Sequence, residues 1–159
     1  MNIDFLKDNN RFNARVSAII YNSEKNKILL FKVDDGRNFY LLPGGRIEFY
    51  EDSKTAIKRE IMEELGWNLE FDLCSIQENF LEYHNIKITQ YCFCYKAIYK
   101  GKIDQEKITC RDNTNQTFCW VDISKINDYL IKPESCYDLI LNTDNYIKHI
   151  IEYDNNNFE

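Results

Sequence analysis

The sequence predicts an α/β (α+β) fold, an α/β/α sandwich in which helices flank a mixed β-sheet. Two β-rich runs come first, and a stretch with helical periodicity follows around residues 57–65. Further β-rich runs come after it, and the chain closes with a segment that we expect to be helical. Strands on both sides of a helix are typical of a mixed sheet whose faces are covered by helices.

The first two strands are expected at residues 15–20 and 27–33, which are rich in Val, Ile and Leu. The polar residues 22–26 between them predict a hairpin. A second turn at residues 34–38 should lead into a short strand at 39–42.

After the helix, residues 74–82 and 87–99 predict a second antiparallel pair, joined by a turn at His84 and Asn85. A short strand is expected at 118–121.

The C-terminal part is predicted to be mainly helical. A brief helix should run to about residue 130, with Asp122 or Ser124 as its cap. A longer C-terminal helix is expected at 134–151.

We expect one domain, because 159 residues lie in the usual single-domain range. Residues 1–159 would form it, with a core at about 11–151 and a frayed tail at 152–159. Residues 1–10 lack the pattern of a signal peptide, and no apolar stretch approaches the length of a membrane span. We therefore expect a cytoplasmic protein with no membrane partner.

The net charge of −6 makes nucleic acid an unlikely partner, since no basic patch is available to neutralise its phosphates. A small anionic substrate that arrives with its own metal ion stays compatible with this charge. Neither a Cys-x-x-Cys pair nor a matching histidine spacing occurs, so we expect free thiols at the six cysteines. These are Cys74, Cys92, Cys94, Cys110, Cys119 and Cys136.

Three glutamates stand at i, i+3 and i+4 in the helical segment, so a helix places Glu60, Glu63 and Glu64 on one face. Their like charges repel, and a divalent cation would remove the penalty. Oxygen ligands without His or Cys favour Mg²⁺ or Mn²⁺ over zinc. The neighbouring arc carries the side chains that should pack on the sheet, namely Ile57, Ile61 and Leu65.

Such a helix is more often a solvated surface, on which lysines and arginines balance the glutamates. The flanking residues favour a site instead. Gly44 and Gly45 follow an expected strand and permit close backbone approach, and Gly66 suits the end of a helix. A strand, a glycine loop and an acidic helix in this order indicate a metal–phosphate site.

Residues 45–67 also match G-x5-E-x7-R-E-U-x-E-E-x-G-U, in which U is apolar. This segment resembles the signature box of the Nudix hydrolases, with Trp67 bulkier than the usual final residue. The matching residues are Gly45, Glu51, Arg59, Glu60, Ile61, Glu63, Glu64, Gly66 and Trp67.

The resemblance implies hydrolysis of a nucleoside diphosphate linked to another moiety, by attack of water on phosphorus. It implies one to three Mg²⁺ or Mn²⁺ ions held by Glu60, Glu64 and Glu63 with the Gly44 carbonyl, and a catalytic role for Glu60, Glu63 and Arg59. In the family Arg59 orients a glutamate through an ion pair, and Glu51 supports the loop or the outer metal shell. Gly45 is also assigned a supporting role. The general base is either a box glutamate or one of the downstream carboxylates Glu78, Glu82, Glu106, Asp112 and Glu134.

Substrate-binding residues are harder to infer. Arg15 and Arg46 are candidates for phosphate contacts, and Phe39 and Tyr83 for stacking on a base. Strand packing or solvent exposure explains these residues equally well. Alternatives to the enzyme are a nucleotide-binding sensor without catalysis and an RNA 5′-end pyrophosphohydrolase. The resemblance also allows a homodimer.

Overall fold

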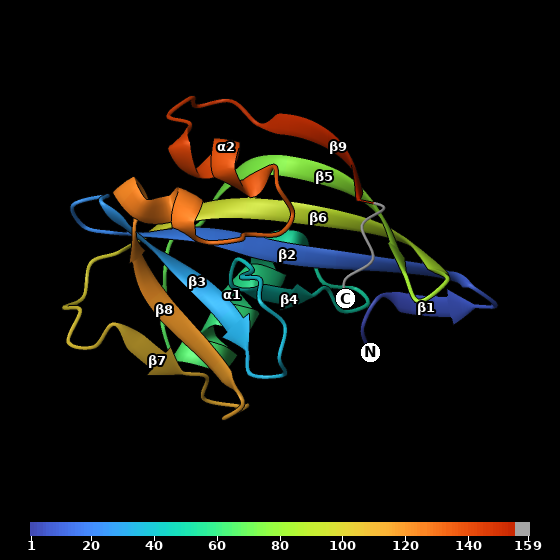
Figure 1. Ribbon diagram of the computed structural model, residues 1–159, viewed down its shortest axis with the longest axis horizontal. Coiled ribbons are helices and arrows are strands. Elements are labelled where there is room, and N and C mark those ends of the chain that lie inside the picture. Colours follow the sequence, from blue (N-terminus) through green and yellow to red (C-terminus); the bar gives the residue numbers. More distant parts are fainter. Residues whose placement is uncertain (155–159) are drawn as a thin grey trace.

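A computed structural model describes residues 1–154 of the chain. Within them, nine strands form one mixed sheet with helices on its faces, which confirms the predicted fold class (Figure 1). The strand order is β7-β8-β3-β2-β6-β5-β9, and β1 and β4 also pair with β2. The strands are β1 (Asp4–Lys7), β2 (Asn10–Asn22), β3 (Lys27–Val33), β4 (Gly44–Arg46), β5 (Asp72–Tyr83), β6 (Ile86–Tyr99), β7 (Lys107–Thr109), β8 (Gln116–Asp122) and β9 (Lys148–Asp154). The helices are α1 (Ser53–Leu65), the 3-10 helix η1 (Ile123–Asp128) and α2 (Cys136–Leu141).

The centre of the sheet is formed by β2, β6 and β5, which lie side by side in Figure 1. β2 and β6 are parallel, and their register places Asn13 opposite Gln90. β5 and β6 form the predicted antiparallel pair, with His84 and Asn85 at positive φ angles of 47° and 62° in the turn. Two successive residues with positive φ suit a tight hairpin, because their twist matches that of the strands.

Each face of the sheet has its own hydrophobic core. Side chains alternate along β2, so Val16, Ala18 and Ile20 pack in the core beneath α1. Ile19 points the other way, into the core beneath η1 and α2. The two helical layers therefore cover opposite faces.

The predicted C-terminal helix at 134–151 is wrong. The helix ends at Leu141, and β9 then pairs in parallel with β5, which places His149 in a strand. The β-branched and aromatic residues of β9 favour a strand, and β5 offers an edge with unpaired backbone groups. The expected tail at 152–159 begins inside this strand, and residues 155–159 lie outside the described part.

Several shorter elements also differ from the predictions. β1, β4 and β7 were not predicted, and Gly44 and Gly45, which were expected in a loop, lie in β4 and pair with β2. The expected strand at 39–42 makes only isolated bridges, from Tyr40 to Ile131 and from Leu41 to Phe31. The brief helix after β8 is the 3-10 helix η1, and Asp122 precedes it without a capping side-chain bond. No helix of the described residues is long and apolar enough to cross a membrane.

Candidate active site

Helix α1 begins and ends at clear local signals. Asp52 Oδ1 accepts a hydrogen bond from the Thr55 backbone N–H at 2.9 Å, which satisfies one of the free donors of the first turn. At the other end Gly66 adopts a left-handed conformation with φ of 74°, and its N–H donates to the Met62 carbonyl at 2.9 Å. These caps place the acidic segment within the helix.

The three glutamates of α1 differ in exposure. Glu64 is buried, with 7% of its surface exposed, because it lies beside the apolar residues that face the sheet. The side chain of Glu60 is 15% exposed and that of Glu63 is 49% exposed. The cluster therefore runs from the buried side of the helix out to solvent.

The backbone of β4 passes directly against this cluster. A Cβ atom at Gly45 would lie 2.1 Å from the carboxylate carbon of Glu60. A Cβ atom at Gly44 would lie 2.1 Å from the Val16 carbonyl oxygen. At Gly44 the clash is with backbone, so only glycine fits there, whereas at Gly45 a Cβ atom would force the Glu60 carboxylate to move.

Arg59 connects the glutamates to the loop before the helix. Its Nε and Nη2 donate to the two carboxylate oxygens of Glu51, at 2.8 and 3.0 Å. Its Nη1 donates to Glu60 at 2.9 Å and lies 3.4 Å from Glu63. Glu51 also accepts a bond of 2.9 Å from the Glu48 backbone N–H, which holds the loop. A bidentate guanidinium–carboxylate pair of this kind fixes orientation as well as charge.

The pKa values of the carboxyl groups at the site shift in different directions. Hydrogen bonds from Arg59 lower the pKa of Glu51. Burial raises the pKa of Glu60 in spite of Arg59. Burial, followed by the charges of Glu60 and Asp112, raises the pKa of Glu64 from 4.5 to about 8. Ionisation of Glu60 and Glu64 is thus disfavoured by burial and by their proximity, and a bound cation would offset both effects.

The loop that carries Asp112 is held against the end of α1. The Arg111 backbone N–H donates to the Glu64 carbonyl at 2.9 Å. Asp112 itself accepts a bond of 2.8 Å from the Cys110 thiol. Among the downstream carboxylates, Glu78 lies elsewhere and contacts His149 at 2.6 Å.

A cavity of about 300 Å³ lies on the face of the sheet opposite α1. Arg15, Phe39 and Tyr83, three of the four residues considered for substrate binding, line it. Arg15 is also close enough to the glutamates for its charge to lower the pKa of both Glu60 and Glu64, against the larger effect of burial.

Arg46, the fourth candidate, is engaged with the N-terminal strand. Its Nε lies 2.7 Å from Asp4 Oδ2, close enough for an ion pair but not aligned for a hydrogen bond. Asp4 is itself held by Arg11 through two bonds of 2.7 and 2.6 Å. Arg46 is therefore committed to β1, which the sequence did not predict.

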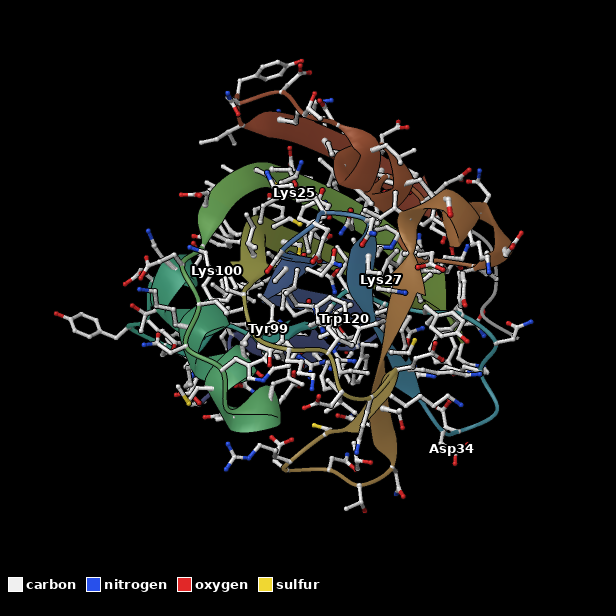
Figure 2. The ribbon with its side chains drawn as sticks, turned by 90° about the vertical axis from the view of Figure 1, so that its left-hand side faces the viewer. Lys25, Lys27, Asp34, Tyr99, Lys100 and Trp120 are labelled. Atoms are coloured by element: carbon white, nitrogen blue, oxygen red, sulfur yellow. The ribbon has the colours of Figure 1, made fainter. Side chains whose placement is uncertain are left out.

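A second and larger cavity, of about 1000 Å³, lies at the C-terminal end of α1. Trp67, Tyr99 and Lys100 line it, and Figure 2 shows Tyr99 and Lys100 on this side of the molecule, with Trp120 beside Tyr99. The Trp67 and Tyr99 rings stack with centroids 3.9 Å apart.

The NUDIX domain family model matches residues 11–137. This range includes β4, α1 and the strands β5 and β6, which contribute to the smaller cavity. The chain belongs to the Nudix family. The resemblance drawn from residues 45–67 is thereby confirmed, and the protein is accordingly a hydrolase that acts on phosphoric anhydrides.

Several solved structures share the Nudix fold with this chain. The mutator protein MutT from Bacillus halodurans is 16% identical, with a TM-score of 0.69 over 89% of this chain and 90% of that one. The E. coli dihydroneopterin triphosphate pyrophosphohydrolase is 17% identical, with a TM-score of 0.56 over 80% and 91%. An ADP-ribose pyrophosphatase from Streptococcus suis is 15% identical, with a TM-score of 0.54 over 89% and 98%. At these identities the likeness shows the fold alone. None of the curated proteins compared with the chain matches it.

The Nudix glutamates suit a hard divalent cation by their chemistry. In the described part of the chain, no three Asp, Glu, His or Cys side chains converge closely enough to hold an ion as they stand. However, Glu64 Oε2 is buried without any hydrogen-bond partner. A buried carboxylate oxygen without a hydrogen bond is costly, and Mg²⁺ or Mn²⁺ would compensate it. The donors thus fit the metal that the family implies.

Sequence reasoning missed a row of amides on the floor of the smaller cavity. Gln77 and Asn79 of β5 and Gln90 of β6 line it, and the first two are almost fully buried. A signal existed in the sequence, because two amides two residues apart lie on one face of a strand whose neighbours are largely apolar.

Proposed function

We propose that this Nudix protein is a pyrophosphohydrolase, dependent on Mg²⁺ or Mn²⁺, that cleaves the diphosphate linkage of a nucleoside diphosphate derivative. One observation carries the proposal. Buried Glu64, with an unpartnered oxygen and a raised pKa, lies in the same electrostatic cluster as Arg15, which lines a cavity of about 300 Å³. Arg15 therefore lines the ligand cavity and acts electrostatically on the glutamates that we assign to the cation.

Glu60 and Glu64, with Glu63 and the carbonyl of Gly44, are the ligands that we assign to the metal. A bound divalent ion supplies charge neutralisation of the diphosphate and lowers the pKa of the attacking water. The missing Cβ atom of Gly45 lets the β4 backbone approach the Glu60 carboxylate, and that of Gly44 lets it approach the backbone of β2.

Arg59 acts as a positioning residue in this proposal. It joins Glu51 of the loop to Glu60 of the helix by bonds of 2.8 to 3.0 Å, so the carboxylate of Glu60 cannot rotate freely. Arg15 is assigned to the phosphates, because it carries positive charge at the border of the cavity and the glutamates.

The general base is either the solvent-facing Glu63 or Asp112. Glu63 has a side chain that is 49% exposed, so water reaches it. Asp112 is the downstream carboxylate whose charge contributes to the raised pKa of Glu64, which indicates that it lies near the site. Separate substitutions of the two, with kcat measured against pH, distinguish these assignments.

The proposed substrate is a free nucleotide derivative, such as a nucleotide sugar, an ADP-ribose-like compound or a nucleoside triphosphate. The net charge of −6 supports this class over RNA. We also propose a cytoplasmic location, on composition alone, and leave a homodimer as a proposal that sedimentation would test.

The test is turnover of these three substrate classes with Mg²⁺ or Mn²⁺, with the products identified by mass spectrometry. Release of a nucleoside monophosphate or of pyrophosphate supports the proposal. Folded protein that releases no product from any of them overturns it. Nucleotide that binds and is recovered unaltered would indicate a sensor, and equal turnover of capped or triphosphorylated RNA would indicate 5′-end processing.

A further inference from the structure

Three amide side chains form a hydrogen-bonded row across the sheet, and two of them, Asn79 and Gln90, line the smaller cavity. The strand register places Asn13 of β2 opposite Gln90 of β6, and Gln90 opposite Asn79 of β5. Gln90 Nε2 donates to Asn13 Oδ1 at 3.0 Å, and Asn79 Nδ2 lies 3.4 Å from Gln90 Oε1. The hydrogen bonds therefore run in a single direction, from Asn79 through Gln90 to Asn13.

This direction leaves one acceptor without a donor. Asn79 is only 2% exposed, and its Oδ1 is buried with no hydrogen-bond partner. The next strand does not supply a donor, because Asn79 faces Glu152 of β9. The Glu152 carboxylate is instead engaged with the Ser135 hydroxyl, from which it accepts a hydrogen bond at 2.6 Å. A buried amide oxygen in this state costs free energy that a ligand N–H would recover.

The cavity around Asn79 has the form of a nucleobase site. Its volume of about 300 Å³ is within the range of small-molecule sites. The aromatic residues Phe39 and Tyr83 contribute to its walls, and the apolar Leu81 and Ile88 contribute to its floor. Proteins read a base in such sites by stacking on its face and hydrogen bonding to its edge.

The position of Asn79 relative to Arg15 suits a nucleotide. Arg15 lies two residues from Asn13 on β2, on the same face, and Asn79 is two strands away. From the spacing of strands and residues, the two side chains start about 12 Å apart. A nucleoside diphosphate spans such a distance, with its base at Asn79 and its phosphates at Arg15.

We propose that Asn79 selects the base of the substrate: its buried Oδ1 accepts a hydrogen bond from a ring or exocyclic N–H on the edge of a nucleobase in the smaller cavity. This assignment rests on the proposed function, because it assumes that the cavity holds the nucleoside part of the substrate. Asn79 would thus determine specificity, and the base would have to present an N–H donor on its edge.

Binding is measured by calorimetry with α,β-methylene nucleoside diphosphates, whose bridging carbon prevents cleavage, in the presence of Mg²⁺. Each parent base is compared with a partner that lacks the edge N–H. The pairs are adenosine with purine riboside, cytidine with 2-pyrimidinone riboside, uridine with 3-methyluridine, and guanosine with 1-methylinosine. The affinity ratio is evaluated for the parent nucleotide that binds most tightly and its partner.

We expect the wild-type protein to bind that parent about 10- to 100-fold more tightly than its partner, as for one buried hydrogen bond. Asn79→Leu, which has a similar shape and no acceptor, should bring the ratio close to one without weakening the partner's binding. If circular dichroism shows that Asn79→Leu does not fold, Asn79→Ala is measured in its place. Asn68→Leu, at an exposed asparagine that lines the larger cavity, is the matched control and should keep the wild-type ratio.

The proposal is overturned if none of the four parents binds, if the wild-type ratio is close to one, or if an Asn79 variant retains the ratio. These outcomes are separable from the fate of the proposed function, since no hydrolysis is measured. A protein that cleaves its substrate but ignores the edge N–H refutes the role of Asn79 alone. A protein that discriminates between the pairs but releases no product from any substrate refutes the hydrolase alone.

Discussion

The two cavities described above differ in size and in whether their buried polar groups have hydrogen-bond partners. The larger one, of about 1000 Å³, lies at the end of α1 beside Trp67 and Tyr99, and the smaller one, of about 300 Å³, lies beside Arg15 and Asn79. Among the described residues that line the larger cavity, no buried side-chain nitrogen or oxygen lacks a hydrogen-bond partner. Lys96 Nζ donates to the Asn142 carbonyl at 2.6 Å, and the Trp67 ring stacks on Tyr99 at 3.9 Å.

Two buried side-chain oxygens of the described residues lack a hydrogen-bond partner, Asn79 Oδ1 in the smaller cavity and Glu64 Oε2 on α1. Folding leaves such groups unsatisfied only at a cost, so they point to a ligand or an ion more directly than volume does. The comparison teaches that the unmet hydrogen-bonding and charge requirements of a cavity, rather than its size, indicate function.

The largest expected effect is on catalysis at α1. Glu64→Gln should lower kcat/KM by about 10²- to 10⁴-fold, because the buried oxygen that we assign to the metal becomes a neutral amide. Glu63→Gln should lower turnover by a similar factor if Glu63 is the base. Steady-state kinetics on the best substrate measure both.

Glu70→Gln, at an exposed carboxylate that lines the larger cavity, is the control for these variants and should retain the wild-type rate. If Glu70→Gln lowered kcat/KM strongly and Glu64→Gln did not, the reaction would be assigned to the larger cavity instead of to the glutamates of α1.

The next largest effect is expected at the contact between β4 and the helix. Gly45→Ala places a methyl group 2.1 Å from the carboxylate carbon of Glu60, so this carboxylate must move. We expect kcat/KM to fall about 10- to 100-fold, as for a misplaced catalytic group, with a loss of about 1–3 kcal/mol in unfolding free energy. Kinetics and urea unfolding measure the two quantities. A variant that is as active as wild type would show that the position of Glu60 does not matter.

A smaller effect concerns the pH dependence of stability without metal. Because the pKa of Glu64 is about 8 in the folded protein and 4.5 when unperturbed, its protonated form is favoured on folding. Its contribution is fully present below pH 4.5 and is lost as the pH rises through 8. Between pH 5 and 8 the melting temperature should therefore fall by about 2–6 °C more in the wild-type protein than in Glu64→Gln.

Thermal unfolding in the presence of a chelator, with wild type and Glu64→Gln side by side, measures this difference. Addition of Mg²⁺ should raise the wild-type melting temperature more at pH 8 than at pH 6, because a proton and a cation compete for the same oxygen. Parallel curves for the two proteins would contradict a buried, titrating Glu64.

The smallest functional effect is expected in the larger cavity. Trp67→Leu removes the stacking contact with Tyr99, which is worth about 0.5–1.5 kcal/mol beyond the buried area. The unfolding free energy should fall by more than that, whereas kcat/KM should stay within about threefold of wild type. If instead kcat/KM falls tenfold while the unfolding free energy is unchanged, the larger cavity takes part in the reaction.

Local patterns in the sequence were enough to predict α1 and the hairpin of β5 and β6. The spacing of Glu60, Glu63 and Glu64 depends only on helical geometry, and Gly66 ends the helix by its own conformational preference. The His84-Asn85 turn likewise depends on two neighbouring residues. The catalytic and metal-binding roles of these residues stay predictions.

Contacts between distant strands were outside the reach of these patterns. The sequence at 148–154 is compatible with a helix or a strand. It forms the strand β9 because it pairs with the open edge of β5. Arg46 was considered for phosphate binding, but its ion pair with Asp4 depends on a strand that pairs only in the folded protein.

By itself, then, the sequence determined the acidic helix, its glycine approach and the family, because these depend on residues within one short segment. Tertiary structure alone decided how deeply Glu64 is buried and that Asn13, Gln90 and Asn79 meet in one row. The physical reason is that burial and hydrogen-bond satisfaction are properties of strand register and packing, which bring together residues more than sixty positions apart.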